Sequence, residues 1–407
     1  MIKQIWKPIF SILLCTLMLF HSSINLSAEQ DHSKTNQTKS AELDISSPSV
    51  CLMETNTGTI CYAKNENQSL PMASVTKVMT LLLIFEALDA KQIALDQSVS
   101  ISEHAASMGG SQVFLEPGEI QTVETLIKCI SIASANDGSV ALAETVAGSE
   151  EAFVERMNQK AGDLHMENTH FVNCCGLDAP NHHSSAKDLA IVSRELITKH
   201  PEIFDYCTIW QEDITHQTKK GATPFTLTNT NKLLKQYPYA TGLKTGSTSV
   251  AKYCLSATAK KDNLSFIAVI MAAPTPKDRF KDALTLLEYG FNSTGFYTDS
   301  IKEATYPVKI TKGVKDKIDA SPEHDFTFLA LKGENLSQIK KKEMVKKELQ
   351  APIKKGTVVG KISYYIGDNC IGSVSLVANT GVKKATYPYY LWDISRQYFI
   401  SDKKSGK

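Results

Sequence analysis

The sequence predicts an α+β (α/β) protein in which a mainly antiparallel sheet, flanked by helices, is followed by a smaller all-β domain. Apolar runs of helical length, at residues 78–88 and 123–133, are accompanied by strand-like runs at 253–259 and 264–271. Beyond residue 296, short strands with period-two spacing alternate with lysine-rich turns. The 407 residues are enough for two domains plus tails.

The composition excludes some classes of function. With 42% apolar residues, 21% charged residues and a net charge of +1, the chain is globular and gives no electrostatic reason to bind nucleic acid. No metal-ligand spacing, phosphate-binding loop or dinucleotide fingerprint occurs in it. We therefore expect no metal, no other cofactor and no nucleic-acid partner.

The N-terminal segment has the pattern of an export signal. Lys3 and Lys7 precede an apolar run at 9–20, and small residues before Glu29 fit a cleavage site. This predicts a signal peptide over residues 1–28, followed by a polar, disordered leader over residues 29–40. The alternative is an uncleaved membrane anchor. Either way we expect the chain outside the cytoplasm, on the outer face of the cytoplasmic membrane or in the cell wall.

The most informative pattern is a Ser-x-x-Lys motif at Ser74 and Lys77. Four other serines also precede a lysine by three residues, so context decides, and only Ser74 begins a long apolar helix. Lys77 then lies one turn later on the same face, within reach of the Ser74 hydroxyl. It can act as a base if burial and a neighbouring cation such as Lys244 lower its pKa. The alternative is an N-cap serine with a solvated lysine.

Two further motifs follow along the chain, and folding of one domain can bring them next to Ser74. Ser134 and Asn136 stand on a predicted turn between two helices, where a hydroxyl can relay a proton and an amide can orient a lysine or the substrate. Lys244, Thr245 and Gly246 stand on a predicted edge strand. A substrate backbone can lie against the glycine as an added strand, with its carboxylate on the lysine and threonine. In isolation, Ser134 and Asn136 are better explained as a capping pair, and the alternative for Lys244, Thr245 and Gly246 is an ordinary turn with a surface lysine.

Taken together, the motifs resemble those of the penicillin-recognising serine enzymes, and among them the low-molecular-weight D-alanyl-D-alanine carboxypeptidases. The likeness extends to segments 108–119, 171–178, 183–190 and 229–234. It implies a β-lactamase/transpeptidase-like catalytic domain over residues 41–298 and a β-sandwich stalk over 299–384. A tail over 385–407 would complete the chain.

The resemblance also implies a mechanism and its partners. The enzyme would remove the terminal D-alanine of peptidoglycan stem pentapeptides through an acyl-enzyme, and β-lactams would acylate the same serine. The implied catalytic residues are Ser74, Lys77 and Ser134; those implied to bind substrate are Asn136, Lys244, Thr245 and Gly246; the implied oxyanion hole uses the backbone N–H groups of Ser74 and Ser247. Four further matches are interpreted as structural anchors of loops: Asn173, His183, Asp188 and Arg279.

Three positions depart from the family pattern. Cys175 stands where many relatives have histidine or threonine, Lys252 replaces a glycine, and Ser247 replaces a histidine found in some relatives. They put rate and substrate preference in question, though not the reaction class. Two alternatives stay open: a class A β-lactamase, whose Glu-x-x-Leu-Asn loop is missing here, and a non-catalytic peptidoglycan-binding relative.

The cysteines and the tail complete the set of expectations. Cys51 and Cys61 flank a predicted hairpin turn and could pair, but buried free thiols are the favoured interpretation for the eight cysteines beyond the signal. The tail over 385–407 combines aromatic residues with terminal lysines and is too short to span a bilayer. It predicts attachment to the membrane surface, with a helix packed on the β domain as the competing interpretation.

Overall fold

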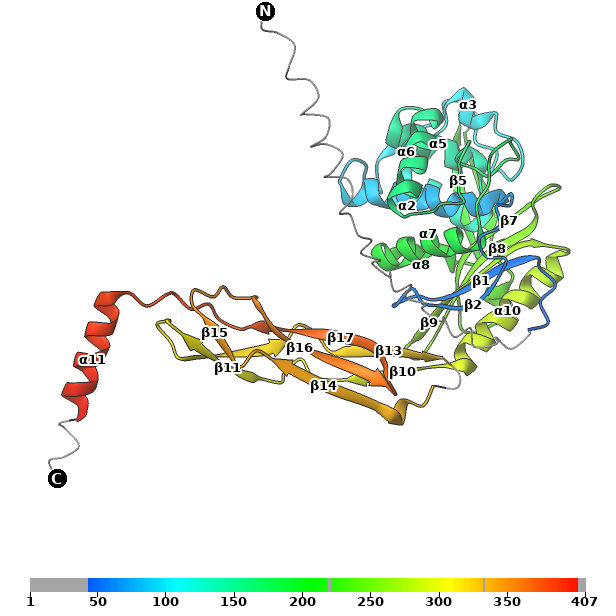
Figure 1. Ribbon diagram of the computed structural model, residues 1–407. Coiled ribbons are helices and arrows are strands. Elements are labelled where there is room, and N and C mark those ends of the chain that lie inside the picture. Colours follow the sequence, from blue (N-terminus) through cyan, green and yellow to red (C-terminus); the bar gives the residue numbers. More distant parts are fainter. Residues whose placement is uncertain (1–42, 219–220, 332–333, 402–407) are drawn as a thin grey trace, which may run out of the picture. The chain divides into compact units, whose positions relative to one another are not determined.

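The computed structural model describes residues 43–218, 221–331 and 334–401 (Figure 1). The predicted signal peptide and leader lie outside these described residues. The described part combines helices, a central antiparallel sheet and a C-terminal β domain, which confirms the predicted fold class.

The central sheet has five strands and every neighbouring pair in it is antiparallel. In spatial order these are β2 (Ile60–Lys64), β1 (Ser49–Glu54), β9 (Leu264–Ala273), β8 (Lys252–Lys261) and β7 (Ala240–Thr248). The strand that carries the Lys-Thr-Gly motif, β7, therefore lies at the edge of the sheet, as predicted.

Helices cover both faces of this sheet. The described helices of the catalytic part are α2 (Lys77–Asp89), α3 (Glu103–Ala106), α4 (Val123–Lys128), α5 (Asn136–Ala147), α6 (Glu150–Asp163), α7 (Ala186–Lys199), α8 (Phe204–Cys207), α9 (Leu233–Gln236) and α10 (Pro276–Ser293). Figure 1 shows α10 on one side of the sheet and α2 and α7 on the other. Alternate residues of β9 enter the two cores, because successive side chains of a strand point to opposite faces: Ile267 and Val269 pack with α2 and α7, whereas Phe266 and Ala268 pack with α10.

The helix α2 is central to the larger core. Ten of its 13 residues are buried, and a helix that is apolar on all sides is stable only when it is surrounded. Other helices begin at side-chain caps that the sequence supplies: the hydroxyls of Ser149, Ser185 and Thr275 accept hydrogen bonds from the first turns of α6, α7 and α10.

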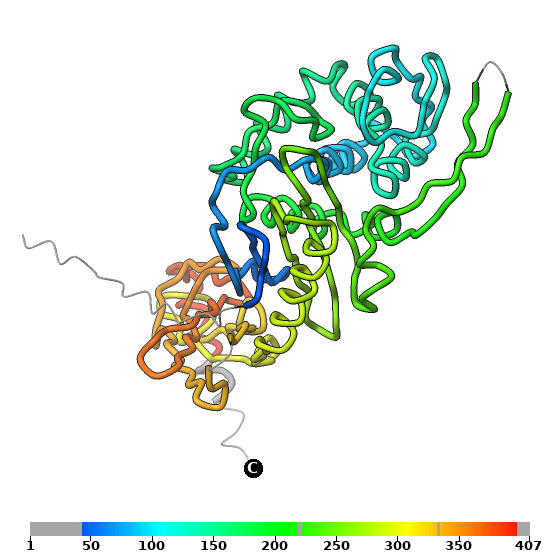
Figure 2. The backbone as a smooth tube through the Cα atoms, turned by 90° about the vertical axis from the view of Figure 1, so that its right-hand side faces the viewer, coloured from blue at the N-terminus to red at the C-terminus, as the bar shows by residue number. Residues whose placement is uncertain are grey.

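Short elements complete the catalytic part. They are the pair β3 (Ser98–Ser100) and β4 (Ile120–Thr122), the hairpin β5 (Gln211–Thr218) and β6 (Gly221–Thr228), the 3₁₀ turns η1 (Ala73–Thr76) and η3 (Pro201–Ile203), and the π turn η2 (Cys129–Ala133). Figure 2 shows β5 and β6 as a long hairpin. Lys128 contacts Glu212 near its base at 2.6 Å, and His216, nearer its tip, contacts Glu119 at 2.8 Å.

The cysteines carry free thiols throughout the described residues. Cys51 lies in the core on one face of the sheet and Cys61 in the core on the other, so the two sulfurs cannot pair. Seven of the eight are buried, and only Cys370 is exposed. The favoured interpretation of buried free thiols is confirmed for those seven.

The C-terminal β domain packs two sheets on one core. One holds β10 (Thr294–Asp299) and β13 (Phe326–Leu331); the other has the order β14 (Ile339–Val345), β16 (Val358–Ile366), β17 (Asn369–Ala378), β12 (Lys317–Pro322), β11 (Tyr306–Thr311) and β15 (Glu348–Gln350), with the 3₁₀ turn η4 (Leu336–Gln338) before β14. The rings of Phe326 and Tyr364 stack across the core at 3.7 Å, which joins the two sheets. This arrangement agrees with the predicted β-sandwich.

The last described element is the helix α11 (Tyr387–Ser401). The Tyr389 hydroxyl donates to the Val314 carbonyl at 2.8 Å, so the beginning of α11 contacts the β domain. Among the described residues, no helix has both the length and the apolarity needed to cross a bilayer.

Candidate active site

Ser74 and Lys77 lie where η1 passes into α2. Ser74 belongs to the 3₁₀ turn and is partly exposed, whereas Lys77 is the first residue of α2 and fully buried. The Lys77 Nζ atom lies 3.1 Å from the Ser74 Oγ atom. The prediction that the lysine reaches the serine from the next helical turn is therefore confirmed, and the solvated-lysine alternative is wrong.

The amine of Lys77 is held by two further oxygens. Its Nζ atom donates to Asn136 Oδ1 and to the Cys175 carbonyl, both at 2.6 Å. Burial lowers the pKa of Lys77 from its ordinary value, partly opposed by nearby cysteines and Asp137. A neutral amine has two N–H donors and one lone pair. In the neutral form these two oxygens take both N–H donors and the lone pair faces Ser74 Oγ, 3.1 Å away, which is the arrangement a general base needs.

A second pair of groups forms around Ser134. This residue follows the π turn η2 and adopts a left-handed conformation, with φ of 63°, before α5 begins at Asn136. Lys244 Nζ donates to Ser134 Oγ at 2.8 Å. Burial, followed by the charges of Lys77 and Arg279, lowers the pKa of Lys244 well below its ordinary value. The Ser134 hydroxyl and the Lys244 amine are therefore close enough to exchange a proton.

Asn136 connects the two pairs. Its Oδ1 atom accepts from Lys77, while its Nδ2 atom donates to the Gly109 carbonyl at 2.6 Å. These two bonds fix both ends of the side-chain amide. The backbone N–H of Asn136 donates to the Ser111 carbonyl at 2.7 Å, which also fixes the backbone. Because Ser134 lies only two residues away, the Lys77 and Lys244 clusters are parts of one site.

The edge strand β7 passes beside Ser74. A Cβ atom added to Gly246 would lie 2.8 Å from Ser74 N and 2.9 Å from Met72 O, so only glycine permits this approach. The Thr245 hydroxyl pairs with the Thr230 hydroxyl at 2.6 Å, and Ser247 is exposed on the same strand. Arg279 supports the strand from behind by donating to the Gly246 carbonyl at 3.1 Å.

The loop over residues 173–177 delivers the carbonyl that Lys77 needs. Asn173 Oδ1 accepts from the backbone N–H groups of Cys175, Gly176 and Leu177, at 2.7 to 3.1 Å. Gly176 has φ of 89°, and a Cβ there would overlap the Ala73 carbonyl. This confirms that Asn173 is a structural anchor. The role of the Cys175 carbonyl was not predicted, since a backbone acceptor leaves no mark in residue type.

His182 is a second contributor that the sequence did not reveal. Its Nδ1 atom accepts from the Val172 N–H at 3.0 Å, so the proton resides on Nε2, which contacts the Thr76 hydroxyl at 2.8 Å. Burial lowers the pKa of His182 to about 4, so it is neutral near pH 7. Thr76 in turn donates to the Ala73 carbonyl at 2.8 Å, which fixes the turn that carries Ser74.

Two of the three departures from the family pattern, Lys252 and Cys175, have structural explanations. Lys252 has φ of 56°, a conformation that glycine adopts at no cost, which explains why a glycine suits this position. Cys175 contributes its backbone carbonyl to the site, and another residue type would supply the same atom. Neither departure removes a contact of Lys77 or Lys244.

Comparisons with known proteins show the family of this chain. The family described as D-alanyl-D-alanine carboxypeptidase matches residues 34–275, and the C-terminal domain of penicillin-binding protein 5 matches residues 297–384. These matches define a serine peptidase of the penicillin-recognising class. The chain belongs to the family of D-alanyl-D-alanine carboxypeptidases, the low-molecular-weight penicillin-binding proteins.

Individual relatives cover nearly the whole chain. The D-alanyl-D-alanine carboxypeptidase DacF of Bacillus subtilis (strain 168) is 40% identical over 386 residues, 95% of this chain and 97% of the relative. DacD of Escherichia coli (strain K12) is 36% identical, covering 82% of this chain and 86% of the relative. The structure of penicillin binding protein 5 from Haemophilus influenzae superimposes with a TM-score of 0.74 at 31% identity, over 84% of this chain and 99% of that one.

The close approach at Gly246 yields a prediction. Gly246→Ala should push β7 away from Ser74, lower the rate of acylation by benzylpenicillin at least about tenfold, and lower the free energy of unfolding by about 1–3 kcal/mol. Stopped-flow acylation and urea denaturation measure the two effects. Gly162→Ala in α6, where the added methyl meets nothing within 4 Å, is the matched control. Equal acylation rates for the two variants would contradict the packing described here.

Proposed function

We propose that Ser74 is the nucleophile of this D-alanyl-D-alanine carboxypeptidase and that Lys77 is its general base. The observation that carries the proposal is the 3.1 Å contact of the buried Lys77 amine with Ser74, while Asn136 and Cys175 occupy its other donors. The proton of the Ser74 hydroxyl passes to Lys77 as Oγ attacks the carbonyl between the two terminal D-alanines of a stem peptide.

The remaining site residues act on charge and on the leaving group. The backbone N–H groups of Ser74 and Ser247 stabilise the oxyanion. Ser134 and Lys244 pass a proton to the amine of the departing D-alanine, and a water molecule then hydrolyses the ester on Ser74. The 2.8 Å contact between Ser134 and Lys244 supports this relay.

Substrate binding follows from the edge position of β7. The stem peptide adds to this strand, Gly246 leaves room for its backbone, and Lys244 and Thr245 receive the terminal carboxylate. Asn136 orients both Lys77 and the peptide. A β-lactam presents a similar amide and carboxylate, so it acylates Ser74 and is released slowly.

The direct test is release of free D-alanine from a D-Ala-D-Ala pentapeptide by the full chain. We expect Ser74→Ala to lower kcat by about four to six powers of ten and to abolish labelling by fluorescent penicillin. Ser337→Ala is the matched control, because this exposed serine also precedes a lysine by three residues. A Ser74→Ala variant that still releases D-alanine at the normal rate would refute the assignment. Rapid turnover of penicillin would favour a β-lactamase instead.

The lowered pKa of Lys77 gives a prediction for pH dependence. Because the neutral amine is the base, kcat/KM should rise with pH as Lys77 loses its proton, with a midpoint below the ordinary lysine value. Lys77→Arg keeps the positive charge but cannot deprotonate, so it should lose about three powers of ten at every pH. A pH–rate profile of both proteins measures this. An acidic limb that persists unchanged in Lys77→Arg would contradict the role of Lys77.

We further propose that the exported chain attaches to the membrane surface through α11. Tyr387, Leu391, Trp392 and Ile394 are large apolar side chains of this helix that are exposed. Only Tyr389 among its aromatic residues donates a hydrogen bond to the β domain in the described part of the chain. Aromatic and aliphatic side chains beside basic residues suit the headgroup region of a bilayer.

Vesicle binding tests this attachment. A chain ending at Lys384 should lose vesicle binding, and Trp392→Glu should weaken it at least about tenfold, because each buried apolar side chain contributes about 1.5–3 kcal/mol. Sedimentation with vesicles of anionic phospholipid measures the bound fraction, and D-alanine release from a soluble peptide serves as the control for folding. Equal binding by the truncated and full chains would overturn the proposal and favour the packed-helix interpretation.

A further inference from the structure

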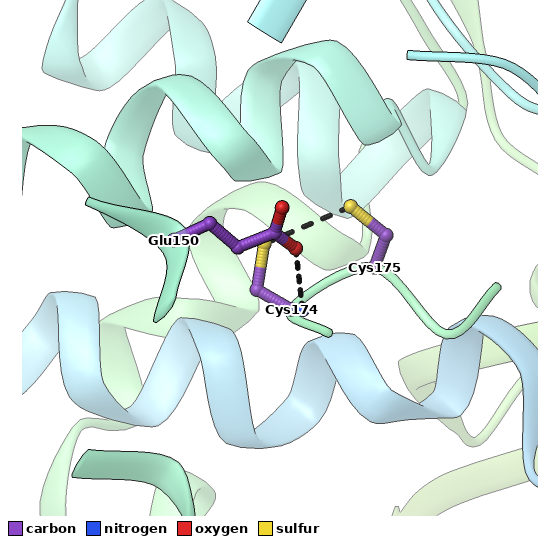
Figure 3. A group of neighbouring side chains, drawn as sticks. All are labelled: Glu150, Cys174 and Cys175. Carbon is purple, nitrogen blue, oxygen red and sulfur yellow. Dashed lines mark hydrogen bonds between the residues drawn. The ribbon is translucent and has the colours of Figure 1, made fainter. Parts of the chain in front are cut away.

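A cluster of metal-ligating side chains lies directly behind the active site. Glu150, Cys174 and Cys175 each place one ligand atom within 4.8 Å of the other two (Figure 3). Both cysteines are fully buried, and their thiols are not used by the proposed mechanism. Cys174 and Cys175 are adjacent in sequence, and their Sγ atoms lie 3.7 Å apart.

This sulfur separation matches a shared metal ion. Two thiolates bound to a tetrahedral Zn²⁺ at about 2.3 Å are about 3.8 Å from each other. The two thiols therefore need little movement to chelate one ion. Chelation by neighbouring residues is unusual in a helix or strand, but here the loop anchored by Asn173 turns both side chains the same way (Figure 3).

Glu150 supplies the third donor and is the member of the cluster nearest to solvent. It is the first residue of α6, and its Oε1 atom accepts from the Cys174 N–H at 3.0 Å. Its Oε2 atom contacts His104 Nε2 at 2.9 Å, and the His104 side chain is 51% exposed. Carboxylates that ligate a metal are themselves hydrogen-bonded by neighbouring groups, and His104 is such a neighbour of Glu150.

We propose that Glu150, Cys174 and Cys175 form a binding site for one thiophilic divalent cation of the Zn²⁺ class, with water as the fourth ligand. Two sulfur donors select such an ion over Mg²⁺ or Ca²⁺, which prefer oxygen. Binding exchanges the two thiol protons for one doubly charged cation, and the protons pass to solvent. The net charge behind the active site is therefore unchanged.

The consequence of binding is mechanical. The Cys175 carbonyl is one of the oxygens that hold Lys77, so an ion on the Cys175 sulfur fastens the loop that positions the base. The bound form is then more stable than the free form, by an amount set by the ion concentration relative to its Kd.

The experiment titrates CdCl₂ into the full, untagged, metal-free chain after reduction of its thiols. We expect one equivalent of Cd²⁺ with a sulfur-to-cadmium charge-transfer band in the ultraviolet, and a rise in the midpoint of thermal unfolding with ZnCl₂. The band arises only when sulfur binds the ion. Binding of Cd²⁺ to Asp89, His200 and Glu202, a cluster without sulfur, therefore does not contribute to it.

Variants decide between this site and others. Cys174→Ser should abolish the band, and Glu150→Gln, which keeps an oxygen for the Cys174 N–H, should weaken binding at least about tenfold. Cys370→Ser, which removes an exposed free thiol, is the control and should bind like the original chain. Fluorescent-penicillin labelling verifies that each variant is folded. If Cys174→Ser does not fold, Glu150→Gln still tests the site.

Two outcomes would overturn the proposal. The first is a reduced chain that binds no Cd²⁺ with a charge-transfer band. The second is a band of unchanged intensity and affinity in folded Cys174→Ser or Glu150→Gln, which would place the ion on other cysteines.

Discussion

The burial of one amine beside one hydroxyl is the constraint on which the rest of the structure depends. Lys77 has lost its water, and three oxygens from Ser74, Asn136 and Cys175 replace it. An amine in such surroundings is poorly solvated as an ammonium ion, so it gives up its proton more readily. The surrounding helices, the π turn and the loop after residue 173 all serve to bring these oxygens to one nitrogen.

Lys244 is a second buried amine whose pKa is lowered by its surroundings. Lys244 reaches the site from the edge of the sheet, and its pKa is lowered further by the charge of Lys77. Two amines that share a dry site cannot both stay protonated at low cost. The lowered pKa values of both amines favour proton transfer to and from the site, as the proposed acyl transfer requires.

Side chains that belong to a recognisable motif were predictable from the sequence, whereas the backbone carbonyl of Cys175 and the supporting side chain of His182 were not. Ser74, Lys77, Ser134 and Lys244 stood out because their types and spacing match a chemistry. Cys175 acts through its carbonyl, and its position depends on Asn173 and on the positive φ of Gly176. The antiparallel sheet followed from apolar strand patterns, whereas the π turn before Ser134 has no pattern of its own and arises from tertiary packing.

The left-handed backbone at Ser134 favours a different residue type from the one that the proposed reaction needs. Glycine or asparagine would adopt φ of 63° more comfortably than serine does, yet neither carries the hydroxyl that meets Lys244. In the proposed mechanism this hydroxyl takes part in proton transfer, so directed evolution for heat resistance alone would enrich two replacements that lower activity, unless each round of selection also demanded product formation.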